Sequence, residues 1–291
     1  IAELIGFDFN KGVIKESEHP FTLNFNNKDV RITTHYYEKN ILSSIFSTIH
    51  EGGHAIYEQQ IDDIVSETVL GEGTSMGIHE SQSRIFENMF GRNIDFLKNI
   101  FNKFDELFDV RSKGIEVEDF YKIVNTVSKS LIRIEADELT YPIHIMIRYE
   151  LEKEIFSNLD EIESSEYIDY LANKWADMYE EFLGVRPTTN SEGILQDVHW
   201  SSGLFGYFPS YALGSAYAAQ IYNSMNKEFS IEENLSNGNF DNINSFLKDK
   251  IHKFGKSKTP NELLILATGE AFNPDYYINY LKEKYRKIYG I

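Results

Sequence analysis

The chain has 291 residues, of which 42% are hydrophobic and 14% aromatic, so it can build a sizeable core and is not intrinsically disordered. Asp and Glu outnumber Lys and Arg by 46 to 28, and the net charge of −18 argues against nucleic acids and anionic membranes as partners. The chain has no cysteine, which excludes a disulfide scaffold and leaves His and carboxylate groups as metal ligands. No stretch approaches the roughly 20 apolar residues of a membrane-spanning helix, and we expect a cytoplasmic protein.

The first 60 residues predict one strand and one long helix. Residues 1–28 have the pattern of a helix end followed by an irregular segment rich in Asn and Gly. Residues 29–37 carry β-branched and aromatic side chains in a short run and predict a strand. Residues 40–60 place apolar side chains such as Ile45 and Ile49 at helical spacing, so we expect a long helix there.

Helical patterns dominate the rest of the chain. Residues 66–78 are rich in Gly and lack helical periodicity, whereas residues 79–107 return to a helical pattern that continues through residue 183. Residues 184–212 predict a second irregular segment, and the last 80 residues alternate helices with Asn-rich turns. The expected fold class is therefore mainly α, with a minor β element.

Residues 50–54 read His-Glu-Gly-Gly-His and fit the H-E-x-x-H pattern of zinc peptidases. Residues four apart lie on one face of a helix, so His50 and His54 can reach the same ion. Glu51 lies beside them, where it can take a proton from the attacking water. The two glycines each cost about 0.5–1 kcal/mol inside a helix relative to Ala. We expect a close backbone approach, by a strand or a substrate, to compensate for them.

A catalytic zinc takes three protein ligands, and the third comes from a separate element. Glu80 follows His54 by 26 residues and has the spacing of a glutamate ligand on a following helix, with His79 as its competitor. The alternative is a surface pair of histidines on an amphipathic helix beside a solvated Glu80.

Six segments together resemble a known family. They are, in order, DVRITT (29–34), HEGGH (50–54), HESQSR (79–84), IRIEAD (132–137), GILQDVHW (193–200) and GYFPSYALG (206–214). In order and spacing they are similar to the signature segments of the carboxypeptidase Taq family of metallocarboxypeptidases, and the resemblance runs over the whole chain.

The resemblance implies a zinc enzyme, with Co²⁺ as an occasional substitute, that releases single C-terminal residues from peptides with a free C-terminus. It also implies a mainly helical metallopeptidase fold with a deep groove, a small β element beside the HExxH helix, and a homodimer. Family members are longer at the N-terminus, so we expect residues 1–291 to form a single catalytic domain without the family's N-terminal helical region. His35 stands where the family usually has Arg after the DVRITT segment.

The tetrahedral intermediate of peptide hydrolysis needs hydrogen-bond donors around its oxyanion. We expect His199, Tyr207 and Tyr211 to supply them, because they cluster in a Gly-rich segment whose backbone can approach a ligand. Related helical metallopeptidases look similar here. The alternative is that the tyrosines are core aromatics in a chain that has 18 of them.

A carboxypeptidase must also bind a free carboxylate, and the planar guanidinium of Arg suits that group. Arg133 is the first candidate and Arg148 the second, although Arg133 can instead pair with Glu135 or Asp137. Arg31 is expected to support a strand that holds the substrate backbone by edge pairing.

Ligating imidazoles usually donate their second N–H to a carboxylate or a carbonyl. Gln196 and Asp197 are candidates for this supporting role, with Asp197 as the acceptor. Many helical zinc peptidases place an Asp four residues after the ligand Glu, but that position is Arg84 here, so the support must be built differently.

Two alternatives stay open from the sequence. The same zinc chemistry serves endopeptidases and dipeptidases. A peptide with an amidated C-terminus would distinguish them, because a carboxypeptidase should lose nearly all activity on it. A truncated, non-catalytic peptide-binding protein is the second alternative, and such a protein should bind little zinc.

Overall fold

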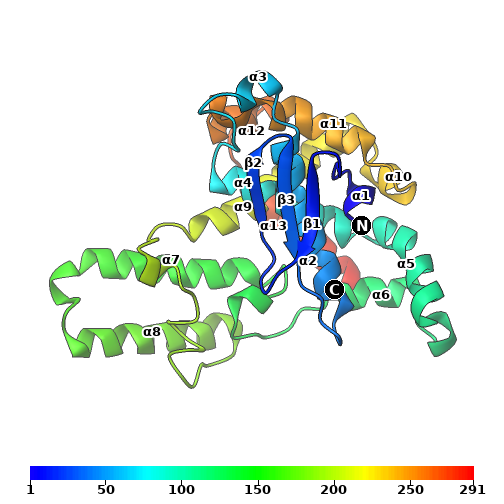
Figure 1. Ribbon diagram of the computed structural model, residues 1–291. Coiled ribbons are helices and arrows are strands. Elements are labelled where there is room, and N and C mark those ends of the chain that lie inside the picture. The colour runs from blue at the N-terminus through cyan, green and yellow to red at the C-terminus, as the bar shows by residue number, and fades with distance from the viewer. The chain divides into compact units, whose positions relative to one another are not determined.

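The computed structural model describes all 291 residues, and the chain divides into two compact units. Unit 1 comprises residues 1–124 and 213–291, and unit 2 comprises residues 125–212. The expected mainly helical fold with a small β element is confirmed, because one three-stranded sheet accompanies the helices (Figure 1). None of the helices combines the length and the apolar character that crossing a membrane requires.

The sheet of unit 1 has the strand order β1-β3-β2, in which β3 pairs in parallel with β1 and antiparallel with β2. The predicted strand at 29–37 is confirmed as β3, although it ends at Thr34. The irregular segment predicted within 1–28 was wrong, since it contains two strands. The elements of this region are α1 (Ala2–Ile5), β1 (Gly12–Glu16), β2 (Thr22–Asn26) and β3 (Asp29–Thr34).

Strand β2 was not predicted because its apolar side chains face outward and its polar side chains face the helix. Its apolar side chains Leu23 and Phe25 are 44% and 61% exposed. Its polar side chains Thr22 and Asn24 instead turn toward carboxylates of the long helix behind the sheet. Alternation along a strand normally places the apolar side chains inside, so a strand with polar contacts inside does not show the usual pattern.

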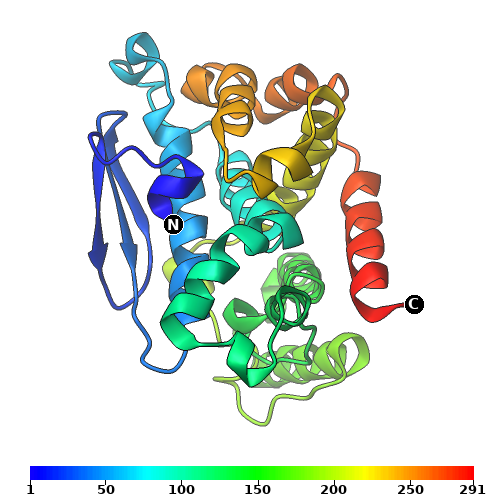
Figure 2. The ribbon, with the colours of Figure 1, turned by 90° about the vertical axis from the view of Figure 1, so that its right-hand side faces the viewer.

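The predicted helix at 40–60 is confirmed as α2 (Ile41–Gln59), which begins where the side chain of Asn40 accepts the N–H of Ser43. One side of α2 packs against β2 and β3, as Figure 2 shows from the side of the sheet. Its fully buried Ile49 and Ile56 belong to the main hydrophobic core of unit 1. The HExxH residues lie in the second half of this helix.

The predicted helix at 79–107 is broken into three parts. They are α4 (Met76–Arg84), the π-helical turn η1 (Ile85–Gly91) and α5 (Ile94–Phe108). Both α4 and η1 pack against α2. Because π-helical turns shift the register of side chains and recur at functional sites, η1 gives the residues after α4 a different set of neighbours.

The other elements of unit 1 complete its core with buried side chains such as Leu235, Leu247 and Leu263. Among them, α12 carries a full capping box, in which Thr259 and Glu262 exchange hydrogen bonds. These elements are α3 (Asp63–Ser66), η2 (Arg111–Lys113), α6 (Val117–Val124), α10 (Ile231–Ser236), α11 (Asp241–Lys250), η6 (His252–Ser257), α12 (Pro260–Thr268) and α13 (Asp275–Tyr289).

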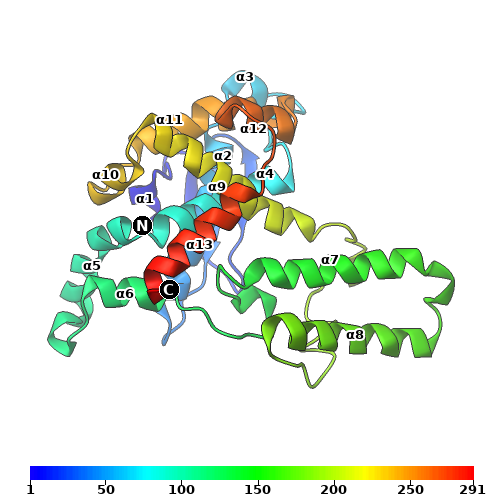
Figure 3. The same ribbon diagram turned by 180° about the vertical axis from the view of Figure 1, so that it is seen from behind.

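Unit 2 is built on two helices that lie side by side, α7 (Tyr141–Ser157) and α8 (Ser165–Leu183) (Figure 3). Their facing side chains, including Leu151, Trp175 and Tyr179, form a separate core. The predicted irregular segment at 184–212 holds as far as Phe208, after which α9 (Pro209–Glu228) begins. Three short turns also belong to unit 2, namely η3 (Arg133–Glu135), η4 (Leu159–Glu161) and η5 (Trp200–Ser202).

Candidate metal centre and arginine cluster

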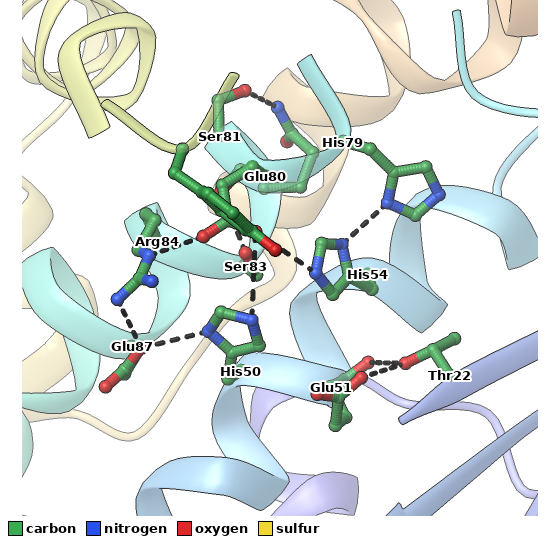
Figure 4. Close-up of polar contacts among 12 residues, drawn as sticks. Thr22, His50, Glu51, His54, His79, Glu80, Ser81, Ser83, Arg84 and Glu87 are labelled. Carbon is green, nitrogen blue, oxygen red and sulfur yellow. Dashed lines mark hydrogen bonds and ion pairs between the residues drawn. The ribbon is translucent and has the colours of Figure 1, made fainter. Parts of the chain in front are cut away.

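Three side chains of unit 1 bring possible metal ligands together. His50 and His54 lie one turn apart on α2, and Glu80 faces them from α4 (Figure 4). One ligand atom from each residue lies within 4.8 Å of the others. The Oε2 atom of Glu80 is 3.9 Å from Nε2 of His50 and 3.6 Å from Nε2 of His54. These are the three residues that the sequence predicted.

Two glycines allow the helices to come close enough for this arrangement. A Cβ on Gly53 would lie 2.6 Å from the backbone oxygen of Gln82, and a Cβ on Gly214 would lie 2.5 Å from Cγ of Glu80. The close approach expected at the HExxH glycines therefore exists, but α4 makes it at Gly53. At Gly52 the neighbour is the side chain of Ile5, so the expected strand or substrate is replaced by helix packing.

His50 is oriented by a carboxylate that the sequence analysis missed. Nδ1 of His50 and Oε2 of Glu87 lie 2.9 Å apart, so the ring donates its Nδ1–H and turns Nε2 toward Glu80. Glu87 lies in the π-helical turn η1, and it also accepts hydrogen bonds from Arg84 and Arg92. Burial alone would raise the pKa of Glu87, but His50 and the two arginines outweigh it and hold that pKa well below its ordinary range.

His54 is oriented differently, through a second imidazole. Its Nδ1 lies 2.6 Å from Nδ1 of His79, and Nε2 of His79 lies 2.7 Å from Oε1 of Glu58. His79, the competing ligand candidate from the sequence, thus contacts Nδ1 of His54, whereas Nε2 of His54 faces Glu80. Glu58 is 3% exposed and is the second carboxylate that the sequence analysis missed.

The two carboxylate oxygens of Glu80 have different neighbours. Its Oε1 accepts a 2.6 Å hydrogen bond from Nε of Arg84, which leaves Oε2 facing the imidazoles. Burial would raise the pKa of Glu80, but Arg84 and the two histidines lower it well below its ordinary value. Arg84 therefore keeps Glu80 ionised.

Glu51 is oriented by the sheet. The hydroxyl of Thr22 on β2 donates a 2.6 Å hydrogen bond to Oε2 of Glu51, whose residue is 8% exposed. Two residues along the same strand, Asn24 donates to Oε2 of Glu58. One short strand thus holds two carboxylates that lie seven residues apart on α2.

The charges of this centre suit a divalent cation. Four carboxylates, Glu51, Glu58, Glu80 and Glu87, face two guanidinium groups, Arg84 and Arg92, so the negative charges exceed the positive ones by two when the histidines are neutral. Two imidazole nitrogens and one carboxylate oxygen form the ligand set of many catalytic zinc sites. The residues present therefore fit a divalent metal.

The arginine candidates form a buried cluster in unit 2. Arg133 donates from Nε and Nη2 to the carboxylate of Asp197, with a shortest distance of 2.8 Å, and its backbone N–H donates to Gln196. Burial would lower the pKa of Arg133, but Asp197 outweighs it and raises that pKa. The ion-pair partner of Arg133 is thus Asp197, and not Glu135 or Asp137, which the sequence left open as an alternative.

Arg148 shares the same carboxylate. Its Nη2 lies 2.9 Å from Oδ2 of Asp197, and the residue is only 1% exposed. Its guanidinium lies 4.4 Å from the ring centres of both Trp175 and Trp200. Burial is the main cause that lowers the pKa of Arg148, to about 10. Two guanidinium groups therefore share one carboxylate.

The predicted oxyanion donors also lie together in unit 2. Nε2 of His199 is 3.0 Å from the hydroxyl of Tyr211, and the ring centre of Tyr207 is 5.4 Å from that of His199. Burial and the nearby Arg133 lower the pKa of His199, which favours the neutral ring. Arg133 also lies 4.9 Å from the ring centre of Tyr211, so the predicted catalytic group and the arginine cluster are neighbours.

A third missed carboxylate fixes this segment. Glu152 on α7 is 4% exposed, and its two oxygens accept hydrogen bonds from the indole N–H of Trp200 and the backbone N–H of Gly206. These two donors directly neighbour His199 and Tyr207 in the chain. The sequence gave little signal for Glu152, because it is one acidic residue among many on a helix.

Other predicted residues have different surroundings from those expected. Asp197 was predicted to accept a hydrogen bond from a ligating imidazole, but this was wrong, because Glu87 and His79 hold those nitrogens and Asp197 binds the arginines. Arg31 lies on the outer face of β3, where it pairs with Asp29.

The family model and the curated relatives that match this chain agree on one family. The family model described as carboxypeptidase Taq (M32) metallopeptidase matches residues 1–285. Carboxypeptidase 1 of Bacillus subtilis is 48% identical over 98% of this chain and 56% of its own length. Thermostable carboxypeptidase 1 of Thermus thermophilus is 41% identical over 98% of this chain and 55% of its own length.

The fold agrees with this assignment. The crystal structure of an M32 carboxypeptidase from Deinococcus radiodurans R1 superposes with a TM-score of 0.93 and 37% identity, covering 100% of this chain and 57% of the other. The chain spans about half the length of the curated relatives it matches.

Proposed function

Because the chain belongs to the carboxypeptidase Taq (M32) family of metallopeptidases, we propose that it is a zinc-dependent carboxypeptidase that releases C-terminal amino acids from peptides. The observation that carries the proposal is the set of His50, His54 and Glu80 around one point, with Glu51 next to the first ligand. A chain that only binds peptides has no need for this ligand set.

We propose that His50 and His54 bind zinc through Nε2 and that Glu80 binds it through Oε2, with Co²⁺ as a possible substitute. Bound zinc would polarise the scissile carbonyl and acidify water for attack. The support of each ligand by a second residue favours this assignment, because oriented ligands bind metals more tightly.

Glu51 is the proposed general base. Thr22 holds Oε2 of Glu51, so Oε1 remains to take the proton from the attacking water and later to pass it to the leaving amine. His199, Tyr207 and Tyr211 are the proposed donors to the oxyanion. The neutral ring of His199 and its contact with Tyr211 support this role, because both groups can donate hydrogen bonds.

Arg133 is the proposed contact for the free carboxylate of the substrate. Two guanidinium groups, those of Arg133 and Arg148, share the single carboxylate of Asp197, and this arrangement supports an anion as the ligand. Since Arg148 is almost fully buried, its proposed part is to add charge and to hold Asp197. Arg31 is proposed to support the sheet whose edge strand, β2, pairs with the substrate backbone.

Three further proposals concern the whole protein. We propose that residues 1–291 act as a single catalytic domain, that the protein is a homodimer, and that it works in the cytoplasm. The family resemblance supports the first two, and the lack of cysteine supports the third. Light scattering of the purified protein would measure its oligomeric state.

The function is tested by incubating zinc-loaded protein with an unblocked peptide and following the products by mass spectrometry. We expect stepwise loss of single C-terminal residues, and Glu51→Gln should abolish it while bound zinc persists. Cleavage inside the peptide, or release of dipeptides, would identify a different peptidase. A zinc-loaded wild type without any cleavage would overturn the enzymatic proposal.

A further inference from the structure

The Nδ1 side of the His54 ring is held by His79 and, through it, by Glu58, two residues that have no assigned part in the reaction. The rings of His54 and His79 have centres 4.7 Å apart, with their Nδ1 atoms facing each other at 2.6 Å. On its other side His79 places Nε2 at 2.7 Å from Glu58. We call His79 and Glu58 the His54 support.

The buried carboxylate of Glu58 has three hydrogen-bond partners. Besides His79, the backbone N–H of Gly73 donates to its Oε1, and the side-chain amide of Asn24 donates to its Oε2. A carboxylate only accepts hydrogen bonds, so Nε2 of His79 must carry the proton between them.

This assignment fixes the protons of the next two nitrogens. A neutral His79 with its proton on Nε2 has a bare Nδ1, which can only accept a hydrogen bond. His54 must then carry its own proton on Nδ1. Its Nε2 is left with a lone pair, on the side where Oε2 of Glu80 lies 3.6 Å away. Imidazole binds a metal through such a lone pair.

The orientation of the His79 ring is also fixed by packing. A Cβ on Gly73 would lie 2.6 Å from Cδ2 of His79, so the backbone at Gly73 lies directly against the ring. The ring of Tyr57 lies on the same imidazole at 5.1 Å between centres, and its hydroxyl accepts the N–H of Thr74. His79 therefore has little freedom to turn.

We propose that His79 and Glu58 are positioning residues, which hold His54 in the one tautomer and orientation that can bind the metal at the site proposed above. The two ligand histidines then reach the same state by different means. His50 donates directly to a carboxylate, whereas His54 donates to a neutral imidazole that donates to a carboxylate in turn.

The proposal predicts a loss of metal affinity when the His54 support is removed. Without an acceptor at Nδ1, His54 can place its proton on Nε2 or rotate, and both changes oppose binding. Loss of a residue that orients a ligand typically weakens metal affinity about 10- to 100-fold. We expect His79→Leu to fall in this range, and Glu58→Gln to have a smaller effect because it keeps an acceptor for His79.

The conservative variant His79→Gln distinguishes positioning from packing. The side-chain oxygen of Gln can accept from His54, and its amide can donate to Glu58. We therefore expect His79→Gln to recover most of the affinity lost in His79→Leu. A purely structural role of the imidazole would leave both variants equally affected.

The experiment measures the zinc dissociation constant of the 291-residue chain by competition with a chromogenic chelator. The absorption spectrum of the Co²⁺-loaded protein gives an independent report on ligand geometry. Urea unfolding of each metal-free variant shows whether it is folded. A matched control is His252→Gln, since His252 is fully buried and lies on the same Tyr57 ring, 4.8 Å between centres.

The expected result is weakened zinc binding and an altered Co²⁺ spectrum in His79→Leu, partial or full recovery in His79→Gln, and wild-type affinity in His252→Gln. Unchanged affinity in both His79→Leu and Glu58→Gln, with tight binding by the wild type, would overturn the positioning role alone. A folded wild type that binds no zinc would overturn the metal site and this inference together. If His79→Leu does not fold, Glu58→Leu takes its place, because it removes the acceptor for Nε2 of His79. We expect it to weaken zinc binding, and wild-type affinity in Glu58→Leu would overturn the positioning role.

Discussion

The metal centre of unit 1 and the arginine cluster of unit 2 are both buried groups of charges, but carboxylates predominate around the first, whereas two guanidinium groups share one carboxylate in the second. Four carboxylates against two guanidinium groups leave the metal centre negative, whereas Arg133 and Arg148 share only Asp197. Unbalanced buried charge is unfavourable unless a partner compensates it. The comparison supports the proposals of a cation at the metal centre and of an anion beside the arginines.

The same difference acts on the histidines of the two regions. Burial would lower the pKa of His50, but Glu87, Glu80 and Glu51 outweigh it and raise that pKa. At His144 in unit 2, burial comes first, and Arg133 adds to it, so its pKa falls to about 4. The pKa values of two buried imidazoles are therefore shifted in opposite directions, because carboxylates outweigh burial at His50, whereas burial acts together with Arg133 at His144.

The largest expected effect on stability comes from removing the carboxylate that two arginines share. Asp197→Asn leaves two buried guanidinium groups without a counter-charge, and breaking such a pair typically costs about 3–5 kcal/mol. Urea unfolding at neutral pH measures the change. The matched control is Asp177→Asn, since Asp177 pairs with Arg186 on the exposed surface of the same unit and should change little. Equal effects of the two substitutions would contradict the buried role of Asp197.

The low pKa of His144 predicts a dependence of stability on pH. A folded-state pKa below the unfolded value near 6.5 means that the unfolded chain binds the proton first. The contribution of the neutral ring is therefore complete above pH 6.5 and is lost as the pH falls toward 4, by about 3 kcal/mol in total. His144 is 1% exposed, so solvent screens little of this effect.

The measurement compares urea unfolding of the wild type and His144→Phe between pH 7.5 and about 4. Other histidines titrate in both proteins, so the difference between the two curves isolates His144. The wild type should lose more stability than the variant over this range. Parallel curves would show that burial and Arg133 do not lower the pKa of His144 in the folded protein.

In the metal centre, the cation should stabilise the fold. Zinc at 100 times its dissociation constant should raise the free energy of unfolding by about 2.7 kcal/mol, provided that it binds only the folded state. Thermal unfolding with zinc and with a chelator measures the shift. Glu80→Ala should lose most of it, and an unchanged shift in that variant would place the ion elsewhere.

The smallest of these effects concerns the segment that carries His199. Glu152→Gln removes an acceptor from either Trp200 or Gly206, and a buried donor left without a partner costs about 1–3 kcal/mol. We expect a lower kcat with little change in zinc affinity, because Glu152 touches no proposed ligand. Turnover and zinc affinity measured on the same preparation separate the two.

The sequence predicted the proposed ligands because they follow a local rule. His50 and His54 share a helix face through their spacing, and Glu80 follows on the next helix. The helix at 40–60 was equally predictable, since its apolar residues recur at helical spacing. The Gly-rich segment indicated His199, Tyr207 and Tyr211, which lie together in unit 2.

The residues that hold the ligands were not predictable in the same way. Glu87 meets His50 only after a π-helical turn, and Glu58 acts through His79, so neither contact follows from regular helical spacing. Arg133 and Asp197 meet across 64 residues of sequence. Tertiary packing decides such pairs, and a single sequence carries little trace of it.

The most direct test of the central claim compares two peptides that differ only at the C-terminus, one with a free carboxylate and one amidated. The zinc-loaded wild type should release the last residue of the free peptide and lose nearly all activity on the amide, because the anion that Arg133 is proposed to bind is missing. Equal hydrolysis of both peptides would contradict a carboxypeptidase and would favour an endopeptidase with the same metal centre.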